Sequence, residues 1–287
     1  MATNRKHRIA GKIPTLAISD LTIEFARRSG VVRVVDNVSL EVWPGEIVGV
    51  IGESGSGKTL TALSTLRMLP KRARVMGGKI RLGEASILDL SEREMRDLRG
   101  SRMALIPQDA MQSLNPTLRI GRQVGEPLEL HKGASLRAAA AAAVRLLTSV
   151  HIRDPESRAR AYPHQFSGGM QQRAMIAMGL ALQPELLIAD EPTTALDVTV
   201  QARVLKLLRE IRDLSGTSIL FITHDLGVVA ELCDWVYVMR HGRIVESGSI
   251  EQIFTAPTED YTRMLLAATP SIHAPRRASA AVQEGKA

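Results

Sequence analysis

Gly52-Glu53-Ser54-Gly55-Ser56-Gly57-Lys58-Thr59 is the most informative stretch of this 287-residue chain. An apolar run, Glu46–Ile51, precedes it and is typical of a β-strand. The segment that follows, Lys58–Leu69, carries leucines at helical spacing. A glycine-rich turn between a strand and a helix matches the phosphate-binding pattern G-x-x-x-x-G-K-[ST], and we refer to these eight residues as the P-loop.

The chemistry of the P-loop follows from its residue types. Glycines allow the backbone to curl so that its N–H groups point inward, and a helix that begins there adds partial positive charge. We predict that Lys58 reaches the β- and γ-phosphates of ATP and that the Thr59 hydroxyl is a ligand of Mg²⁺. The structural alternative is a plain glycine turn that only joins a strand to a helix.

A second apolar run, Leu186–Ala189, ends in two acids, Asp190 and Glu191. Carboxylates at the carboxyl end of a parallel strand lie where ligands bind in α/β proteins. We predict that Asp190 holds Mg²⁺ through water and that Glu191 polarises the water that attacks the γ-phosphate. The alternative is a solvated strand end whose Asp-Glu-Pro sequence begins a turn.

Strands that alternate with helices predict an α/β fold: a P-loop NTPase core with a mainly parallel sheet. Short β-like runs near the beginning of the chain predict an antiparallel β layer packed on this core. Residues 120–181 are mostly helical by pattern and predict an inserted α-helical subdomain, which includes one alanine-rich helix over Leu136–Val150. The β-like runs are Leu21–Phe25, Val31–Val35 and Val38–Val42, and a hairpin is expected over Trp235–Met239 and Arg243–Glu246.

Composition excludes several classes of protein. The single cysteine, Cys233, rules out an internal disulfide and a multi-cysteine metal site. No run approaches 18 apolar residues, so no transmembrane helix is expected, and no apolar segment follows Met1–Arg8, which argues against a signal peptide.

The net charge is +7, but most of the excess lies near the two ends of the chain. We therefore predict a flexible basic tail over 1–14, one ATPase domain over 15–269 with its helical subdomain at about 109–181, and a disordered tail over 270–287.

A narrower signal lies at Phe166–Arg173, about twenty residues before Asp190. This stretch resembles the signature motif of ABC transporter ATP-binding subunits, with Phe166 and Met170 as variants of the usual residues. Physically, we expect Ser167 to cap a helix and the two glycines to expose backbone N–H groups to a phosphate. The resemblance implies that the signature contacts the ATP of a partner subunit. The residues that it assigns to this contact are Ser167, Gly168, Gly169 and Gln171.

The other motifs of the ABC family follow in the expected order, and the resemblance covers residues 16–268. Gln108 resembles the Q-loop glutamine that contacts Mg²⁺ and the attacking water. His224 resembles the switch histidine that contacts the γ-phosphate. The resemblance thus implies that Glu191, His224 and Gln108 are catalytic and that Thr59, Gln108 and Asp190 serve Mg²⁺. Ala195, Leu196 and Asp197 resemble the D-loop, which passes between subunits.

The resemblance also implies a mechanism. Two ATPase domains meet head to tail, each ATP lies between one subunit's P-loop and the other's signature, and a lone subunit hydrolyses weakly. The helical subdomain docks on membrane subunits. The adenine usually stacks on an early aromatic residue; Phe25 is the candidate, and a role as β-layer core is the alternative.

The segments around Gln108–Pro116 and Asp260–Leu266 resemble those of dipeptide, oligopeptide and nickel importers. We therefore expect the D-type ATPase of such a transporter, an ABC-type translocase that hydrolyses ATP to drive peptide uptake. Its expected partners are a related second ATPase, two permeases and an extracytoplasmic binding protein, at the cytoplasmic face of the inner membrane. Import of nickel or another small solute is the alternative. An ABC ATPase acting on nucleic acid or ribosomes, an inactive regulatory partner and an exporter ATPase are disfavoured.

Overall fold

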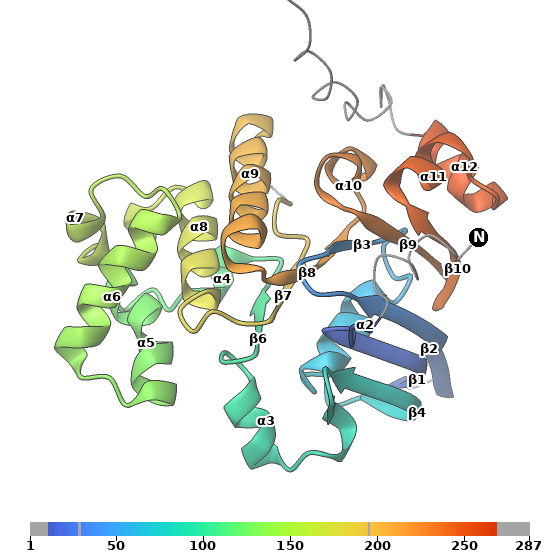
Figure 1. Cartoon of the computed structure of the whole chain (residues 1–287), viewed down its shortest axis with the longest axis horizontal. Helices are drawn as coiled ribbons and strands as arrows, with labels where there is room; N and C mark the ends of the chain where they lie inside the picture. Colours follow the sequence, from blue (N-terminus) through green and yellow to red (C-terminus); the bar gives the residue numbers. More distant parts are fainter. Residues whose placement is uncertain (1–10, 28–29, 195, 269–287) are drawn as a thin grey trace, which may run out of the picture.

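The computed structural model describes residues 11–27, 30–194 and 196–268, which form two β-sheets and a group of helices at one end (Figure 1). The larger sheet has six strands among the described residues, in the order β10-β9-β3-β8-β7-β6. All neighbours pair in parallel except β9 and β10, which form the expected antiparallel hairpin. The strands are β3 (Ile47–Ile51), β6 (Met103–Ile106), β7 (Leu186–Asp190), β8 (Ser218–Thr223), β9 (Trp235–Arg240) and β10 (Arg243–Ser249).

The central strands β3, β7 and β8 are buried along their whole length and mostly apolar, because both faces of this sheet are covered. In β8, Ile219 and Phe221 pack into a core shared with the helices, whereas Leu220 and Ile222 pack into a second core beneath the smaller sheet. The same alternation holds in β7 and β3. Side chains on successive strand residues point to opposite faces, so one apolar run supplies both cores.

The smaller sheet confirms the predicted antiparallel layer. Its order is β2-β1-β4-β5, with β1 (Leu16–Arg27), β2 (Gly30–Val42), β4 (Ala73–Leu82) and β5 (Ala85–Ser86). The runs Val31–Val35 and Val38–Val42 were predicted as separate strands, but both belong to β2. Irregular register against β1 interrupts the alternation between them, which explains why the sequence suggested two strands. β4 was not predicted.

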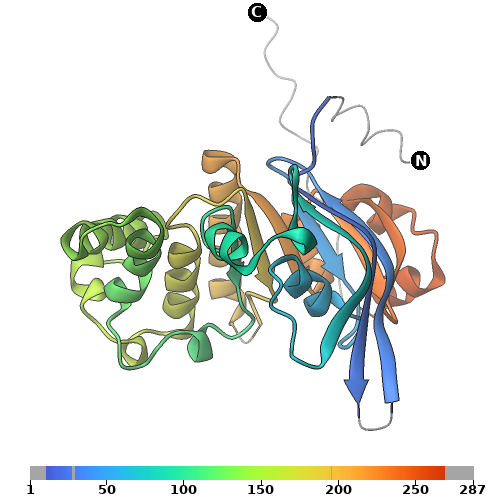
Figure 2. The ribbon, with the colours of Figure 1, turned by 90° about the horizontal axis from the view of Figure 1, so that it is seen from below.

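A helical subdomain extends beyond β6, and both views place it away from the antiparallel sheet (Figures 1 and 2). Glycines allow its helices to approach closely: a Cβ on Gly125 would lie 2.8 Å from the Ala139 backbone oxygen, and one on Gly121 equally close to that of Ala159. The predicted alanine-rich helix is α6. The helices between the sheets and in this region are α2 (Lys58–Thr65), α3 (Glu92–Leu98), α4 (Ala110–Ser113), α5 (Ile120–Lys132), α6 (Leu136–Ser149), α7 (Pro155–Ala159) and α8 (Gly168–Gly179).

The remaining helices return to the six-stranded sheet. α9 (Val198–Ser215) connects β7 to β8, and α10 (Leu226–Leu232) connects β8 to β9. α11 (Ile250–Thr255) and α12 (Asp260–Ala267) follow β10. No helix in the described ranges is long and apolar enough to cross a membrane. Most of the predicted N-terminal tail and all of the predicted C-terminal tail lie outside the described residues, so these two predictions stay untested.

The central strand offers a stability prediction. The Phe221 side chain is fully buried in β8. Phe221→Ala should lower the free energy of unfolding by about 3–5 kcal/mol, because it removes buried apolar surface and leaves a cavity. Chemical denaturation measures this change. Val31→Ala, at a residue 65% exposed in β2, is the control; a similar loss in both variants would contradict the assigned core.

Candidate active site

The P-loop turns between β3 and α2 under tight steric limits. A Cβ on Gly52 would lie 2.1 Å from the backbone oxygen of Met239 in β9. One on Gly57 would lie 2.8 Å from the backbone oxygen of Val34 in β2. Both glycines also have positive φ angles, 150° and 104°. Glycine is therefore required at both positions by conformation and by the neighbouring strands.

Lys58 begins α2, and its side chain curls back over the loop. Its Nζ donates hydrogen bonds to the backbone oxygens of Gly52, at 2.7 Å, and Glu53, at 2.9 Å. Lys58 is only 5% exposed. Burial lowers the pKa of Lys58 below its ordinary value, and the nearby carboxylates, that of Glu191 first, oppose this effect. The ammonium group therefore occupies the loop with backbone oxygens as its partners, where phosphate oxygens could replace them.

A hydroxyl and a carboxylate meet beside the loop. Thr59 Oγ1 donates a hydrogen bond to Asp190 Oδ1 at 3.1 Å. Asp190 is 5% exposed, and burial raises its pKa above the ordinary value, against the hydrogen bond from Thr59. Ser56 Oγ is buried without a hydrogen-bond partner among the described residues, so it is free to donate to a phosphate oxygen. Hard oxygen donors of this kind suit Mg²⁺, which usually takes one or two protein ligands together with substrate phosphates.

Glu191 is the residue on which the other predicted catalytic side chains converge. Its Oε2 accepts hydrogen bonds from Gln108 Nε2 at 3.1 Å and from Thr194 Oγ1 at 3.0 Å. Its Oε1 lies 3.1 Å from His224 Nδ1. The backbone of Glu191 has φ 45°, a left-handed conformation that costs free energy for a residue with a side chain. Residues far apart in sequence thus hold one carboxylate in a strained, fixed position next to Asp190.

The predicted signature residues lie elsewhere, at the start of α8 in the helical subdomain. Ser167 occupies the N-cap position, but its side chain makes no capping hydrogen bond, which corrects the expected serine cap. A Cβ on Gly169 would lie 2.3 Å from a Val200 methyl group, so glycine allows α8 to approach α9. Gln171 is 5% exposed and donates to the Pro163 backbone oxygen at 2.7 Å. Its side chain therefore supports the turn from inside the subdomain.

The D-loop prediction is only partly visible, because Ala195 lies outside the described residues. Leu196 packs on the helical core, and the Asp197 carboxylate accepts a hydrogen bond from the Val200 N–H at 2.9 Å, which caps α9. Phe25 packs partly buried against the core beneath the antiparallel sheet. This placement agrees with a packing role for Phe25 and does not test adenine stacking.

Two residues at the site were missed in the sequence. Thr194 shares the Glu191 carboxylate with Gln108, and Tyr261 of α12 accepts a hydrogen bond from the Glu53 N–H at 3.2 Å. Tyr261 lies within the segment Asp260–Leu266, which resembles that of peptide and nickel importers, and Thr194 directly precedes the D-loop residues. Only the fold shows that these two side chains reach the site.

Residues 35–194 match the family model described as ABC transporter. The chain is 51% identical to the probable peptide ABC transporter ATP-binding protein y4tR of Sinorhizobium fredii, over 89% of this chain and 76% of the relative. It is also 51% identical to the peptidoglycan transport ATP-binding protein YejF of Agrobacterium fabrum, over 90% of this chain but only 47% of that longer protein. Among solved structures, the ATP-binding cassette MJ0796, a dimer bound to ADP and Pi, matches with a TM-score of 0.73 at 25% identity, covering 82% of this chain and 98% of that one.

The close approach at Gly52 gives a prediction for the loop. Gly52→Ala should weaken ATP binding by at least about tenfold, because the new methyl group forces the loop away from Met239. Gly55→Ala is the matched variant, since Gly55 also has a positive φ but a Cβ there meets nothing within 4 Å. Titration with a fluorescent nucleotide measures both affinities. Equal losses in the two variants would mean that the contact with β9 does not shape the site.

Proposed function

Because this chain belongs to the ABC transporter family, we propose that it is the ATP-hydrolysing subunit of an importer for dipeptides and oligopeptides. Membership of this family implies that the chain binds ATP and that its ATP hydrolysis is coupled to transport. The observation that carries the proposal for the site is the convergence of Gln108 and His224 on the Glu191 carboxylate.

In the proposed mechanism Glu191 orients and polarises the attacking water, since a fixed carboxylate can accept a hydrogen bond from it. His224 contacts the γ-phosphate. The Lys58 ammonium group donates to phosphate oxygens in place of the backbone oxygens of Gly52 and Glu53. Thr59, Gln108 and Asp190 would hold Mg²⁺, directly or through water. When bound, this ion would neutralise charge on the phosphates.

The position of the signature supports a composite site. The helix α8 begins in the helical subdomain with Ser167 as its N-cap, followed by Gly168 and Gly169. The P-loop lies between β3 and α2, and these two regions lie apart in Figures 1 and 2. We infer that the signature and the D-loop serve the ATP of a second ATPase subunit in a head-to-tail dimer. A dimer of MJ0796 gives a precedent among similar cassettes. Tighter ATP binding by the closed dimer than by the open one would drive closure.

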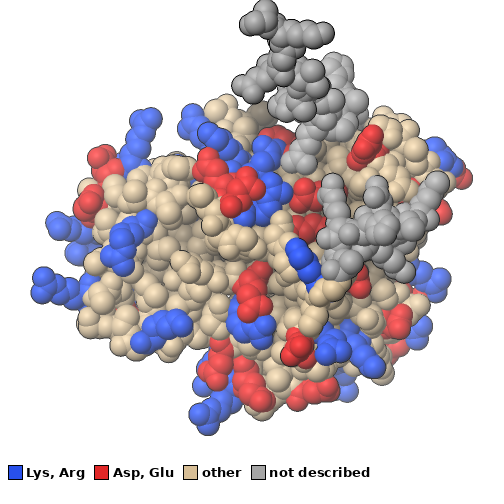
Figure 3. Space-filling model, in the orientation of Figure 1, with Lys and Arg blue, Asp and Glu red and all other residues tan. Residues whose placement is uncertain are grey.

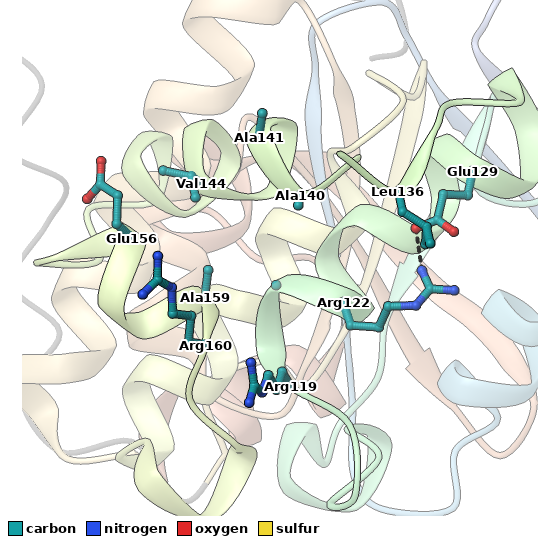
Figure 4. A pocket seen from close by; sticks show the side chains of 11 residues that line it. Arg119, Arg122, Glu129, Leu136, Ala140, Ala141, Val144, Glu156, Ala159 and Arg160 are labelled. Carbon is teal, nitrogen blue, oxygen red and sulfur yellow. Dashed lines mark hydrogen bonds and ion pairs between the residues drawn. The ribbon is translucent and has the colours of Figure 1, made fainter. Parts of the chain in front are cut away.

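The helical subdomain carries the surface proposed to meet the membrane subunits. A pocket of about 470 Å³ opens between α5, α6 and α7 (Figure 4). Ala140, Ala141 and Val144 of α6 line it together with Arg122 and Glu129, which pair with each other. A lining that combines apolar and charged side chains suits a helix from a permease subunit.

Peptide is the proposed cargo because the relatives named above are described as peptide and peptidoglycan transport proteins. We propose a related second ATPase, two permeases and an extracytoplasmic binding protein as partners. The ATPase would then lie peripherally at the cytoplasmic face of the inner membrane. In Figure 3 acidic and basic side chains intermix over the sheets, and basic side chains are more frequent on the helical subdomain at the left. The mixture over the sheets does not favour a nucleic-acid partner there.

The catalytic role of Glu191 can be tested by one substitution. Glu191→Gln should keep ATP affinity within about threefold but slow hydrolysis by more than about a hundredfold, because the amide cannot accept a proton in the same way. Lys58→Ala is the companion variant and should instead weaken nucleotide binding. Nucleotide titration and phosphate release by the complete complex separate these effects. Unchanged turnover in Glu191→Gln would remove Glu191 from the catalytic role.

The cargo can be tested through the binding protein. ATP turnover by the reconstituted transporter should rise when the cognate binding protein carries a dipeptide or an oligopeptide. Nickel, added in the same way, should not stimulate turnover. Stimulation by nickel alone would keep the ATPase assignment and overturn peptide import.

A further inference from the structure

Helix α12 reaches the P-loop through the side chain of Tyr261. The Tyr261 hydroxyl accepts a hydrogen bond from the backbone N–H of Glu53, with 3.2 Å between oxygen and nitrogen, across 208 residues of sequence. We infer that Tyr261 is a positioning residue for the P-loop and thereby sets the affinity for nucleotide. This inference rests on the nucleotide site proposed above.

The tyrosine ring is itself held in place. Tyr261 is only 4% exposed, and the Arg240 guanidinium carbon lies 4.6 Å from the centre of its ring. A guanidinium over an aromatic face is an attractive arrangement. Burial raises the pKa of Tyr261, opposed first by the hydrogen bond from Glu53. The hydroxyl therefore stays neutral near pH 7 and has a fixed direction toward the loop.

The segment that leads into α12 is anchored to the six-stranded sheet. The Glu246 carboxylate in β10 accepts hydrogen bonds from Thr258 N at 2.7 Å, Thr258 Oγ1 at 2.8 Å and Glu259 N at 3.2 Å. Glu246 is 8% exposed, whereas Thr258 and Glu259 are exposed, so these bonds are partly shielded from water. The anchor sits immediately before Tyr261 and sets where α12 begins. A continuous set of contacts thus connects β10 to the P-loop.

Glu53 is held from two directions in this structure. Its N–H donates to Tyr261, and its carbonyl oxygen accepts from Lys58 Nζ at 2.9 Å. When Lys58 binds phosphate in the proposed mechanism, its hydrogen bond to the Glu53 backbone oxygen is lost. The Tyr261 bond then remains to restrain this side of the loop. A loop that is already restrained loses less conformational freedom when nucleotide binds, which favours affinity.

Removal of the hydroxyl alone tests the inference. Tyr261→Phe keeps the ring beneath Arg240 and should raise both the Kd and the KM for ATP about threefold to tenfold, the range expected for one neutral hydrogen bond. The kcat at saturating ATP should change less than about twofold. Tyr237→Phe is the matched control, because the Tyr237 hydroxyl also accepts a backbone hydrogen bond, but from Glu41 of β2 at 3.0 Å and not from the P-loop. The control should leave the KM unchanged.

Hydrogen–deuterium exchange of the full chain provides a readout apart from activity. In Tyr261→Phe the peptide that contains the Glu53 amide should exchange faster than in the wild type, while a peptide covering β7 should not change. An unchanged KM and unchanged exchange, or a loss of melting temperature greater than in Tyr237→Phe, would overturn the positioning role. If Lys58→Ala still binds ATP with wild-type affinity, the proposed nucleotide site is contradicted. If Lys58→Ala weakens ATP binding but Tyr261→Phe has no effect, the nucleotide site is retained and the positioning role of Tyr261 is contradicted.

Discussion

The parallel pairing of β3, β8, β7 and β6 is the constraint on which the site depends. Ile51 pairs with Thr223, Asp190 with Ile222, and Ile106 with Ala189, so these strands end at the same edge of the sheet. Residues of the site lie at the carboxyl end of each strand. The P-loop follows β3, His224 follows β8, Asp190 and Glu191 lie at the end of β7, and Gln108 follows β6. A change in register would separate these groups, and both buried faces of the sheet oppose such a change.

The second constraint is electrostatic. Two carboxylates, Asp190 and Glu191, lie beside the buried ammonium group of Lys58, and each has hydrogen-bond donors of its own. Burial disfavours the charged forms of Lys58 and Asp190, and the attraction between these opposite charges opposes that effect. The site therefore combines a cation for phosphate, hydroxyl and carboxylate oxygens suited to a metal ion, and a fixed carboxylate for water. These are the elements that phosphoryl transfer to water requires.

The sequence predicted the parallel core, the hairpin and the β6 strand closely, because long apolar runs and a P-loop leave few alternative folds. It assigned Gln108, Glu191 and His224 to one site only through motif order, and it did not predict their mutual contacts, since no local pattern places Gln108 beside a residue 83 positions away. It missed β4, whose mixed exposure on an outer sheet gives weak alternation, and it divided β2 where the register shifts. Tyr261 was missed as a site residue because its contact depends on where α12 docks. The proposed contacts with a second subunit and with permeases depend on surfaces of other chains, which no single sequence contains.

The most direct test of the account is a double-mutant cycle between Gln108 and His224, with ATP turnover measured in the complete complex for the wild type, Gln108→Ala, His224→Ala and the double variant. Both side chains contact the Glu191 carboxylate, so loss of either one loosens the group on which the other acts, although Thr194 still donates to it. The account predicts that the double variant is far less impaired than the product of the two single losses. Losses that multiply would show that the two residues act independently and would contradict a site organised around Glu191.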